Sequence, residues 1–226
     1  STRVRSSAAS DVYKRQLCDD REMLLIIDEA QTGFGRLGTM FGFELYGIEP
    51  DILSVSKTLG GGVPIAATLT TAAIEADCYN KGFIHITSHV SDPLPAAAGL
   101  AVIEVIEEEH LVEQAKQRGE YLLARLQELQ ESHEHIGDVR GKGLLVGIEL
   151  VEDREKKTPA DTLAMAVSDE CMRCGLSMNI VRSVGGMLNC FRMAPPLSVT
   201  EQEIDIAIEI IDAALKTVLA SHVSHC

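Results

Sequence analysis

The sequence predicts an α/β protein in which two groups of strands are separated by a long helix. Short apolar runs at residues 23–27, 51–55 and 64–70 each lead into a polar or glycine-rich segment, as buried strands lead into loops. Apolar residues then recur at helical spacing from about residue 96 to residue 130. Strand and helix patterns alternate again after this helix, so we expect a second, smaller α/β part.

The second part is predicted from patterns of the same kind. Strands are expected at residues 143–151, 176–181 and 189–194, and a helix at 162–174. Thr200 should begin the last helix, because Glu203 three residues later completes a capping box. The buried stripe of this helix is expected at Ile204, Ile208, Ile211, Leu215 and Leu219.

We predict five segments along the chain. These are a non-native leader at 1–16, one α/β part at 17–97, a linking helix at 98–130, a second part at 131–221 and a tail at 222–226. Residues 6–16 (SSAASDVYKRQ) resemble a translated transposase-type sequencing adapter, so we place the leader outside the native fold. The alternative is a native disordered arm. Three strands would leave a bare sheet edge, which also suggests that this chain is a fragment of a longer one.

Composition and charge narrow the class of protein. A chain with 46% hydrophobic and 24% charged residues has an ordinary globular composition. The net charge of −14 repels nucleic acid and anionic membranes, so we expect neither as a partner and expect a cytoplasmic protein. The six cysteines are irregularly spaced, which favours free thiols over a disulfide framework. Cys171 and Cys174 form a C-x-x-C pair inside a predicted helix, and we expect them to be structural.

Two charged residues come directly after predicted strands. Asp28 follows the first apolar run, and Lys57 follows the second after one serine. Ligands of open α/β sheets bind at the carboxyl ends of the strands, so both side chains are expected at one rim. The alternative is that Asp28 is a loop or capping carboxylate and Lys57 a solvated lysine.

The sequence motif around Asp28 and Lys57 is more specific than their positions after strands. The segment Leu24 to Ala67 (LLIIDEAQTGFGRLGTMFGFELYGIEPDILSVSKTLGGGVPIAA) resembles the class III aminotransferases, which use pyridoxal 5′-phosphate (PLP). The resemblance implies PLP-dependent transferase fold type I, with the C-terminal part of the large domain followed by the small C-terminal domain. It also implies roles for three residues. Asp28 would pair with the pyridine nitrogen, and Lys57 would form the Schiff base. Gln31 would lie near the phenolic oxygen of the cofactor and near the substrate carboxylate.

Three further segments are similar to the 2,2-dialkylglycine decarboxylases, namely HITSHVSDPLP (85–95), GLSMNIV (175–181) and CFRMAPPL (190–197). The resemblance implies that the Ser88 hydroxyl reaches the cofactor phosphate of a neighbouring subunit. It also implies an alkali-metal ion, potassium, held by the carbonyls of Ser88 and Val90 and the carboxylate of Asp92. Their alternation suits an extended segment, whereas from the residues alone Asp92 is an Asp-Pro turn residue.

Arg192 is the remaining predicted site residue. By the same resemblance it binds the substrate carboxylate through its two-pronged guanidinium, and the alternative is a surface arginine. Ile86 and the segment 181–190 depart from the family pattern, which puts substrate preference in doubt. His133 and His135 fall in a polar segment between elements, where we expect them to be solvated.

The resemblance implies decarboxylation of 2,2-dialkylglycines coupled to transamination of a keto acid such as pyruvate, by a homodimer or larger homo-oligomer with a shared active site. One alternative is an ω-amino-acid or acetylornithine-type aminotransferase. Another is an inactive fragment that retains only a folding or dimerisation role.

Overall fold

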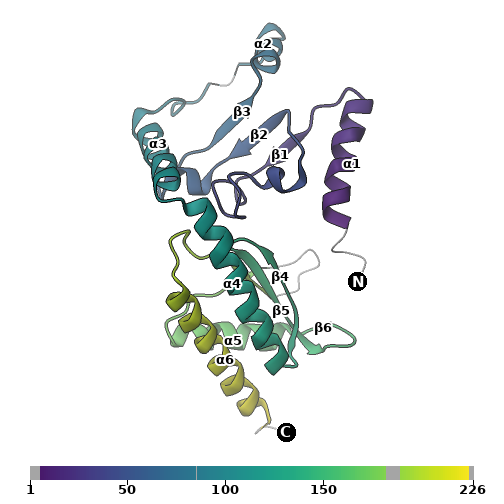
Figure 1. Ribbon diagram of the computed structural model, residues 1–226, viewed down its shortest axis with the longest axis vertical. Helices are drawn as coiled ribbons and strands as arrows, with labels where there is room; N and C mark the ends of the chain where they lie inside the picture. The colour runs from purple at the N-terminus through teal and green to yellow at the C-terminus, as the bar shows by residue number, and fades with distance from the viewer. Residues whose placement is uncertain (1–5, 85, 182–188, 224–226) are drawn as a thin grey trace. The chain divides into compact units, whose positions relative to one another are not determined.

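The computed structural model describes residues 6–84, 86–181 and 189–223. They form two compact units, Ser1–Glu113 and Gln114–Cys226 (Figure 1). None of the helices within the described ranges is long and apolar enough to cross a membrane. Each unit has its own sheet, as an α/β chain with two groups of strands requires.

The sheet of the first unit has three strands in the order β1-β2-β3. β1 (Ile26–Asp28) runs parallel to β2 (Ile52–Val55), and β2 runs antiparallel to β3 (Ala67–Thr70). Short 3-10 turns, η1 (Gly42–Tyr46) and η2 (Lys57–Gly60), lie in the connections between the strands. The three predicted strands are therefore confirmed, each with a later start than the apolar run suggests.

This first sheet is only partly covered by the described residues. Leu53 and Val55 of β2 are buried, at 6% and 2% exposure, but Ile26 of β1 is 62% exposed. Every residue of β3 is exposed. The expectation that the first apolar run is buried is therefore wrong for this chain, because no described element covers it.

The residues predicted to be a leader are largely helical in this structure. Residues Ser6–Asp20 form helix α1, although the segment shows no apolar stripe. The guanidinium of Arg15 donates to the Asp51 carboxyl at 2.8 Å. The pKa of that carboxyl is lowered by the hydrogen bond from the Leu25 amide and then by Arg15. The helix is thus joined to the start of β2, and the adapter origin of residues 6–16 stays a prediction.

The predicted long helix is interrupted, which corrects the expectation of one continuous linking helix. α2 (Ala72–Asn80) precedes it, and its place is taken by α3 (Pro93–Glu108) and α4 (Leu111–Ser132). His110 between them has φ of 53°, in the left-handed region where a right-handed helix ends. Residues 107–109, directly before His110, are all glutamate, so the apolar spacing gives no sign that the helix ends there. The segment boundaries at 97/98 and 130/131 stay predictions.

The second unit is an antiparallel sheet with helices packed on it. Its strands are β4 (Ile136–Lys142), β5 (Leu145–Asp153), β8 (Cys190–Met193) and β7 (Asn179–Val181) in that order, with β6 (Thr158–Pro159) paired to β5. Helix α5 (Asp161–Arg173) packs against β5, β7 and α6 (Glu201–Val223), and Figure 1 shows α5 and α6 side by side. The side chains of Leu122, Leu126, Ile148, Phe191 and Ile211 are among the most buried in this core.

Two local expectations in this unit have opposite outcomes. The capping box is confirmed, because the Glu203 carboxyl accepts from the Thr200 amide at 2.8 Å and the Thr200 hydroxyl accepts from the Glu203 amide at 3.2 Å. The expectation that His133 is solvated is wrong. Its side chain is buried, and Nε2 lies 2.6 Å from an Asp212 carboxyl oxygen on α6.

Candidate active site

The two strands that carry Asp28 and Lys57 are neighbours in the first sheet. β1 and β2 are parallel, and Asp28 stands opposite Ser54 in their register. Asp28 is the last residue of β1, and Lys57 follows the end of β2 by two residues. Both residues are exposed. The fold therefore brings them to the carboxyl edge of the same strand pair, where α/β sheets bind ligands.

Lys57 has an unusual backbone. Its φ is 52°, in the left-handed region that costs a non-glycine residue on the order of 1 kcal/mol. The turn that follows is held tightly, because a Cβ on Gly61 would lie 2.7 Å from Val102 of α3. Its side chain makes no hydrogen bond or ion pair with any residue in the described ranges. The amine is thus presented at the sheet edge by a constrained turn.

Asp28 and Gln31 stand at the two ends of one short turn. An Asp28 carboxyl oxygen accepts from the Ala30 amide at 2.9 Å, which leaves its other oxygen for a ligand. Gln31 is half-buried in the turn that runs on from β1. Glu29, which the sequence pattern does not single out, is 2% exposed between them. The turn therefore presents one carboxyl group outward and holds another inside.

The segment before α3 corrects one expectation. Residues 88–91 form a turn rather than an extended segment, and Ser91 has φ of 60°. The carbonyls of Thr87 and His89 accept backbone hydrogen bonds, whereas those of Ser88 and Val90 accept none from the described residues. The Asp92 carboxyl is half-buried and lies 2.9 Å from His89 Nδ1. The three predicted oxygen ligands are therefore not brought to one side by the alternation of an extended strand. The two carbonyls among them are still available to a hard cation.

Arg192 belongs to the second unit. It lies on β8 between Asn179 of β7 and Gly147 of β5. Phe191 beside it is 1% exposed whereas Arg192 is exposed, as the alternation of a strand requires. Arg192 lines a pocket of about 680 Å³ with Met178 and Pro195, and no described carboxylate pairs with it. The guanidinium is thus free to bind an anion. The segment 182–188, where the family pattern is altered, lies outside the described residues.

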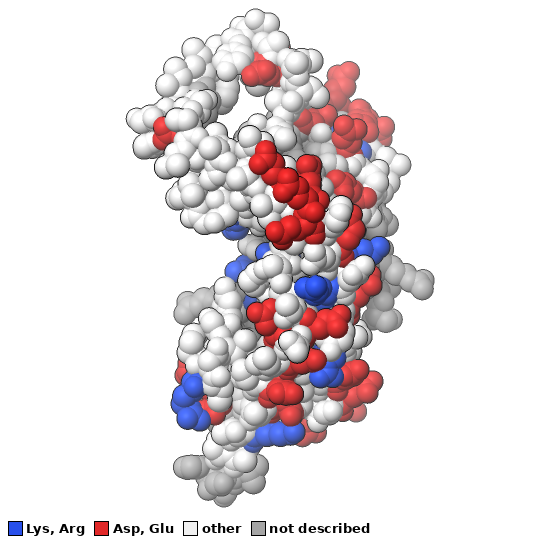
Figure 2. Space-filling model, turned by 60° about the vertical axis from the view of Figure 1, so that its left-hand side comes forward, with Lys and Arg blue, Asp and Glu red and all other residues white. Residues whose placement is uncertain are grey.

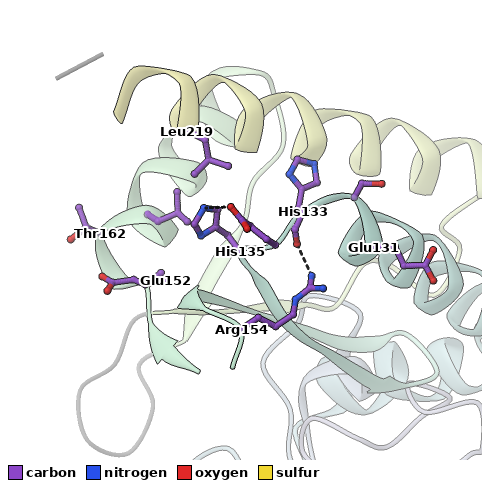
Figure 3. Close-up of a pocket in the computed structure, with 11 residues that line it drawn as sticks. Glu131, His133, His135, Glu152, Arg154, Thr162 and Leu219 are labelled. Carbon is purple, nitrogen blue, oxygen red and sulfur yellow. Dashed lines mark hydrogen bonds and ion pairs between the residues drawn. The ribbon is translucent and has the colours of Figure 1, made fainter. Parts of the chain in front are cut away.

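A larger pocket of about 940 Å³ in the second unit is lined by His133, His135 and Arg154 (Figure 3). Each of these three side chains already has a partner in the protein. Arg154 donates to the carbonyls of Gln130, His133 and Ile136 at 2.6, 2.8 and 3.1 Å and so joins the end of α4 to the start of β4. Nδ1 of His135 lies 3.1 Å from the Val151 carbonyl. Because these contacts already engage its polar side chains, we interpret this pocket as structural.

The two candidate cations, Lys57 and Arg192, belong to a chain that is acidic overall. The chain has 34 acidic and 20 basic residues, and acidic side chains outnumber basic ones on the face shown in Figure 2. Lys57 and Arg192 have no carboxylate partner among the residues described. Unpaired cations on an acidic protein favour small anionic ligands at these positions.

Comparison with known proteins places the chain in a family. The pattern of the aminotransferase class-III family matches residues 8–215. The chain is 51% identical over 203 residues to an uncharacterized aminotransferase of Schizosaccharomyces pombe, covering 89% of this chain and 45% of that protein. It is 39% identical over 210 residues to a leucine/methionine racemase of Thermococcus litoralis, covering 92% and 46% respectively. A solved aminotransferase of Bacillus anthracis superposes with a TM-score of 0.85 at 37% identity, covering 90% of this chain and 47% of that one.

The chain therefore belongs to the class-III aminotransferase family, whose members use PLP. The predicted PLP-dependent α/β fold is confirmed by this match and by the solved relative. The chain spans about half the length of these relatives.

Proposed function

We propose that the complete protein is a PLP-dependent enzyme that moves the amino group of an amino acid to a keto acid. The observation that carries this proposal is the parallel pairing of β1 and β2, which sets Asp28 and Lys57 at one sheet edge. An amine and a carboxyl group at such an edge are the two groups that a PLP ring requires from a protein. Family membership supports the same chemistry.

The described residues fit the cofactor. One Asp28 carboxyl oxygen has no donor among the described residues, so the carboxyl group would be able to hold a proton on the pyridine nitrogen. Lys57 has an amine with no partner among the described residues, which would bond to the PLP aldehyde and, once displaced by the substrate amine, would deliver a proton to the C4′ carbon of the cofactor. Gln31 would orient the substrate, and the Ser88 hydroxyl would donate to a phosphate oxygen. When bound, PLP supplies an electron sink for the substrate α-carbon.

Arg192 would supply substrate binding. Its guanidinium has two parallel N–H donors, which match the two oxygens of a carboxylate. It is exposed, lines a pocket and has no described carboxylate partner, so it keeps these donors for a ligand. The substrate class is therefore an amino acid with a free carboxylate.

The finer proposal is that 2,2-dialkylglycines lose carbon dioxide before the amino group moves on to a keto acid. It is supported by the segment around Ser88, where two carbonyls have no described donor and could hold potassium with Asp92. The contact between His89 and Asp92 works against this, because the carboxyl must turn away from the imidazole to meet the ion.

A second candidate is a plain aminotransferase of the ω-amino-acid or acetylornithine type, in which a proton leaves instead. What favours an aminotransferase in general is the 51% identity to a Schizosaccharomyces pombe protein named as an uncharacterized aminotransferase. A third reading, that this chain alone is inactive, follows from its covering about half of its relatives. We propose weak or no PLP binding for the 226-residue chain alone, which a cofactor titration would test.

The deciding experiment uses the complete protein with 2-aminoisobutyrate, pyruvate and potassium. Equal amounts of carbon dioxide and alanine, both abolished in Lys57→Ala, would support decarboxylation. Alanine from an ω-amino donor without carbon dioxide release would leave the aminotransferase alternative in place. Replacing potassium with a large organic cation should lower the rate only if the proposed ion site exists.

A further inference from the structure

Glu29 is a carboxyl group buried at the edge of the candidate site. It is 2% exposed, although it lies next to the exposed Asp28. A buried carboxyl group is costly unless its oxygens accept hydrogen bonds. One oxygen accepts from the Phe43 amide at 2.8 Å, and the other accepts from the Thr32 hydroxyl. Both oxygens are therefore satisfied by the loop that follows the turn.

The backbone of Glu29 is held as firmly as its side chain. Its amide donates to the Ser54 carbonyl at 2.8 Å, so the pairing of β1 with β2 continues past Asp28. Its carbonyl accepts from the Gly33 amide at 3.0 Å, which closes the turn. Glu29 thus joins β2, the Asp28–Gln31 turn and the start of η1.

The surroundings of the carboxyl group are closely fitted. A Cβ on Gly42 would lie 3.1 Å from each of the two Glu29 carboxyl oxygens. Phe41 and Phe43 stack nearby, with ring centroids 5.6 Å apart and an interplanar angle of 7°. Low polarity around a hydrogen bond strengthens it, and close packing limits its movement.

We infer that Glu29 is a positioning residue whose buried carboxyl group fixes the turn that aims Asp28 and Gln31 at the cofactor. The inference rests on the proposed function of Asp28. Side chains alternate at the end of β1, so fixing Glu29 on the inner side fixes the direction of Asp28 on the outer side. A displacement of about 1 Å at a reacting group costs up to roughly a hundredfold in rate.

The test compares three variants of the complete protein. Glu29→Ala removes the tether. Glu29→Gln keeps it without the charge, because the amide oxygen can accept from Phe43 and the amide nitrogen can donate to the Thr32 hydroxyl. Glu44→Gln changes an exposed acid of η1 and is the matched control.

Glu29→Ala should weaken PLP binding by roughly tenfold to a hundredfold, the factor that corresponds to the loss of two ordinary hydrogen bonds. It should also lower kcat by a larger factor than it raises KM for the amino acid, because Gln31 would be misdirected whereas Arg192 lies in the other unit. Glu29→Gln should stay within about threefold of wild type, and the control should not change. Wild-type behaviour of Glu29→Ala, or equal losses in the Gln and Ala variants, would overturn the inference.

A double-mutant cycle separates positioning from general stability. If Glu29 acts through Asp28, Glu29→Ala should cause little further loss of kcat in an Asp28→Asn background. An undiminished loss there would overturn the inference. If Glu29→Ala does not fold, Thr32→Val removes one donor and should weaken PLP binding by about threefold to tenfold. An unchanged Thr32→Val would then overturn it, whereas failure of the wild type to bind PLP would refute the proposed function instead.

Discussion

Gly119 offers a sharp test of the packing in the second unit. It lies inside α4, where replacing glycine by alanine normally stabilises a helix by about 1 kcal/mol. A Cβ at this position would stand 2.2 Å from the carbonyl carbon of Gly143 and 2.3 Å from its oxygen. These are backbone atoms, and Gly143 has φ of 51° in the tight turn between β4 and β5. The neighbour cannot rotate away, so the helix and the turn must separate.

Overpacking of a well-filled core costs about 1–3 kcal/mol, and a clash with backbone lies at the upper end of that range. After the gain in helix propensity is subtracted, Gly119→Ala should lower the free energy of unfolding by about 2 kcal/mol. The control is Gly99→Ala in α3, whose Cβ would lie 3.5 Å from Leu59, an ordinary contact. That variant should be unchanged or about 0.5–1 kcal/mol more stable.

The assay is urea unfolding of the complete protein followed by circular dichroism, with hydrogen exchange to assign the change to one unit. In Gly119→Ala, exchange should rise in the amides of α4 and the β4–β5 turn. If Gly119→Ala were as stable as Gly99→Ala, the close approach of α4 to Gly143 would be refuted.

Three further results are expected. Thr200→Ala should raise hydrogen exchange in the first turn of α6, whereas Thr200→Ser should not, because serine keeps the capping hydroxyl. Burial raises the pKa of the Cys171 thiol to about 11. Iodoacetamide at pH 8 should therefore label the exposed Cys174 and reach Cys171 only in urea. Mass spectrometry would check this, and labelling of Cys171 in the native protein would contradict its burial. The hydrogen bond from the Leu25 amide lowers the pKa of Asp51, so its contribution to stability is present above pH ~4 and is lost as pH falls through the lowered value; Asp51→Asn should flatten that part of the stability profile in acid unfolding.

Local pattern was sufficient for most strands and for the last helix. Apolar runs gave the strands of the first sheet, and the capping box at Thr200 gave the start of α6 within one residue. These features depend on residues close together in the chain. β4 was missed because it contains glycines and charged residues and depends on its pairing with β5.

The misses arise where tertiary contacts or a single dihedral angle decide the structure. The break between α3 and α4 depends on the positive φ of His110, a single backbone angle that the helical spacing of the apolar residues does not predict. The alternating ligand roles that the family resemblance implies favour an extended segment at 88–91, whereas the chain turns there. His133 was judged polar and solvated, yet its partner Asp212 lies on α6, far away in the sequence.

For the candidate site, the sequence predicts the position of two residues in the fold. Asp28 and Lys57 follow apolar runs, so their shared sheet edge could be predicted from the residues before any family was named. The roles of all the site residues, Asp28 and Lys57 included, came from the resemblance and stay predictions. Glu29 could not be singled out, because its burial depends on Phe43 and Thr32 closing over it. The signal for Glu29 in the sequence is that a second acidic residue directly follows Asp28.

The central claim is that Lys57 is the residue that carries PLP. The most direct measurement is to reduce the complete, PLP-loaded protein with borohydride, digest it and locate the phosphopyridoxyl group by mass spectrometry. We predict a single modified peptide with the group on Lys57, and none in Lys57→Ala. Modification at another lysine, or no modification of a protein that is active with amino acids, would contradict the account.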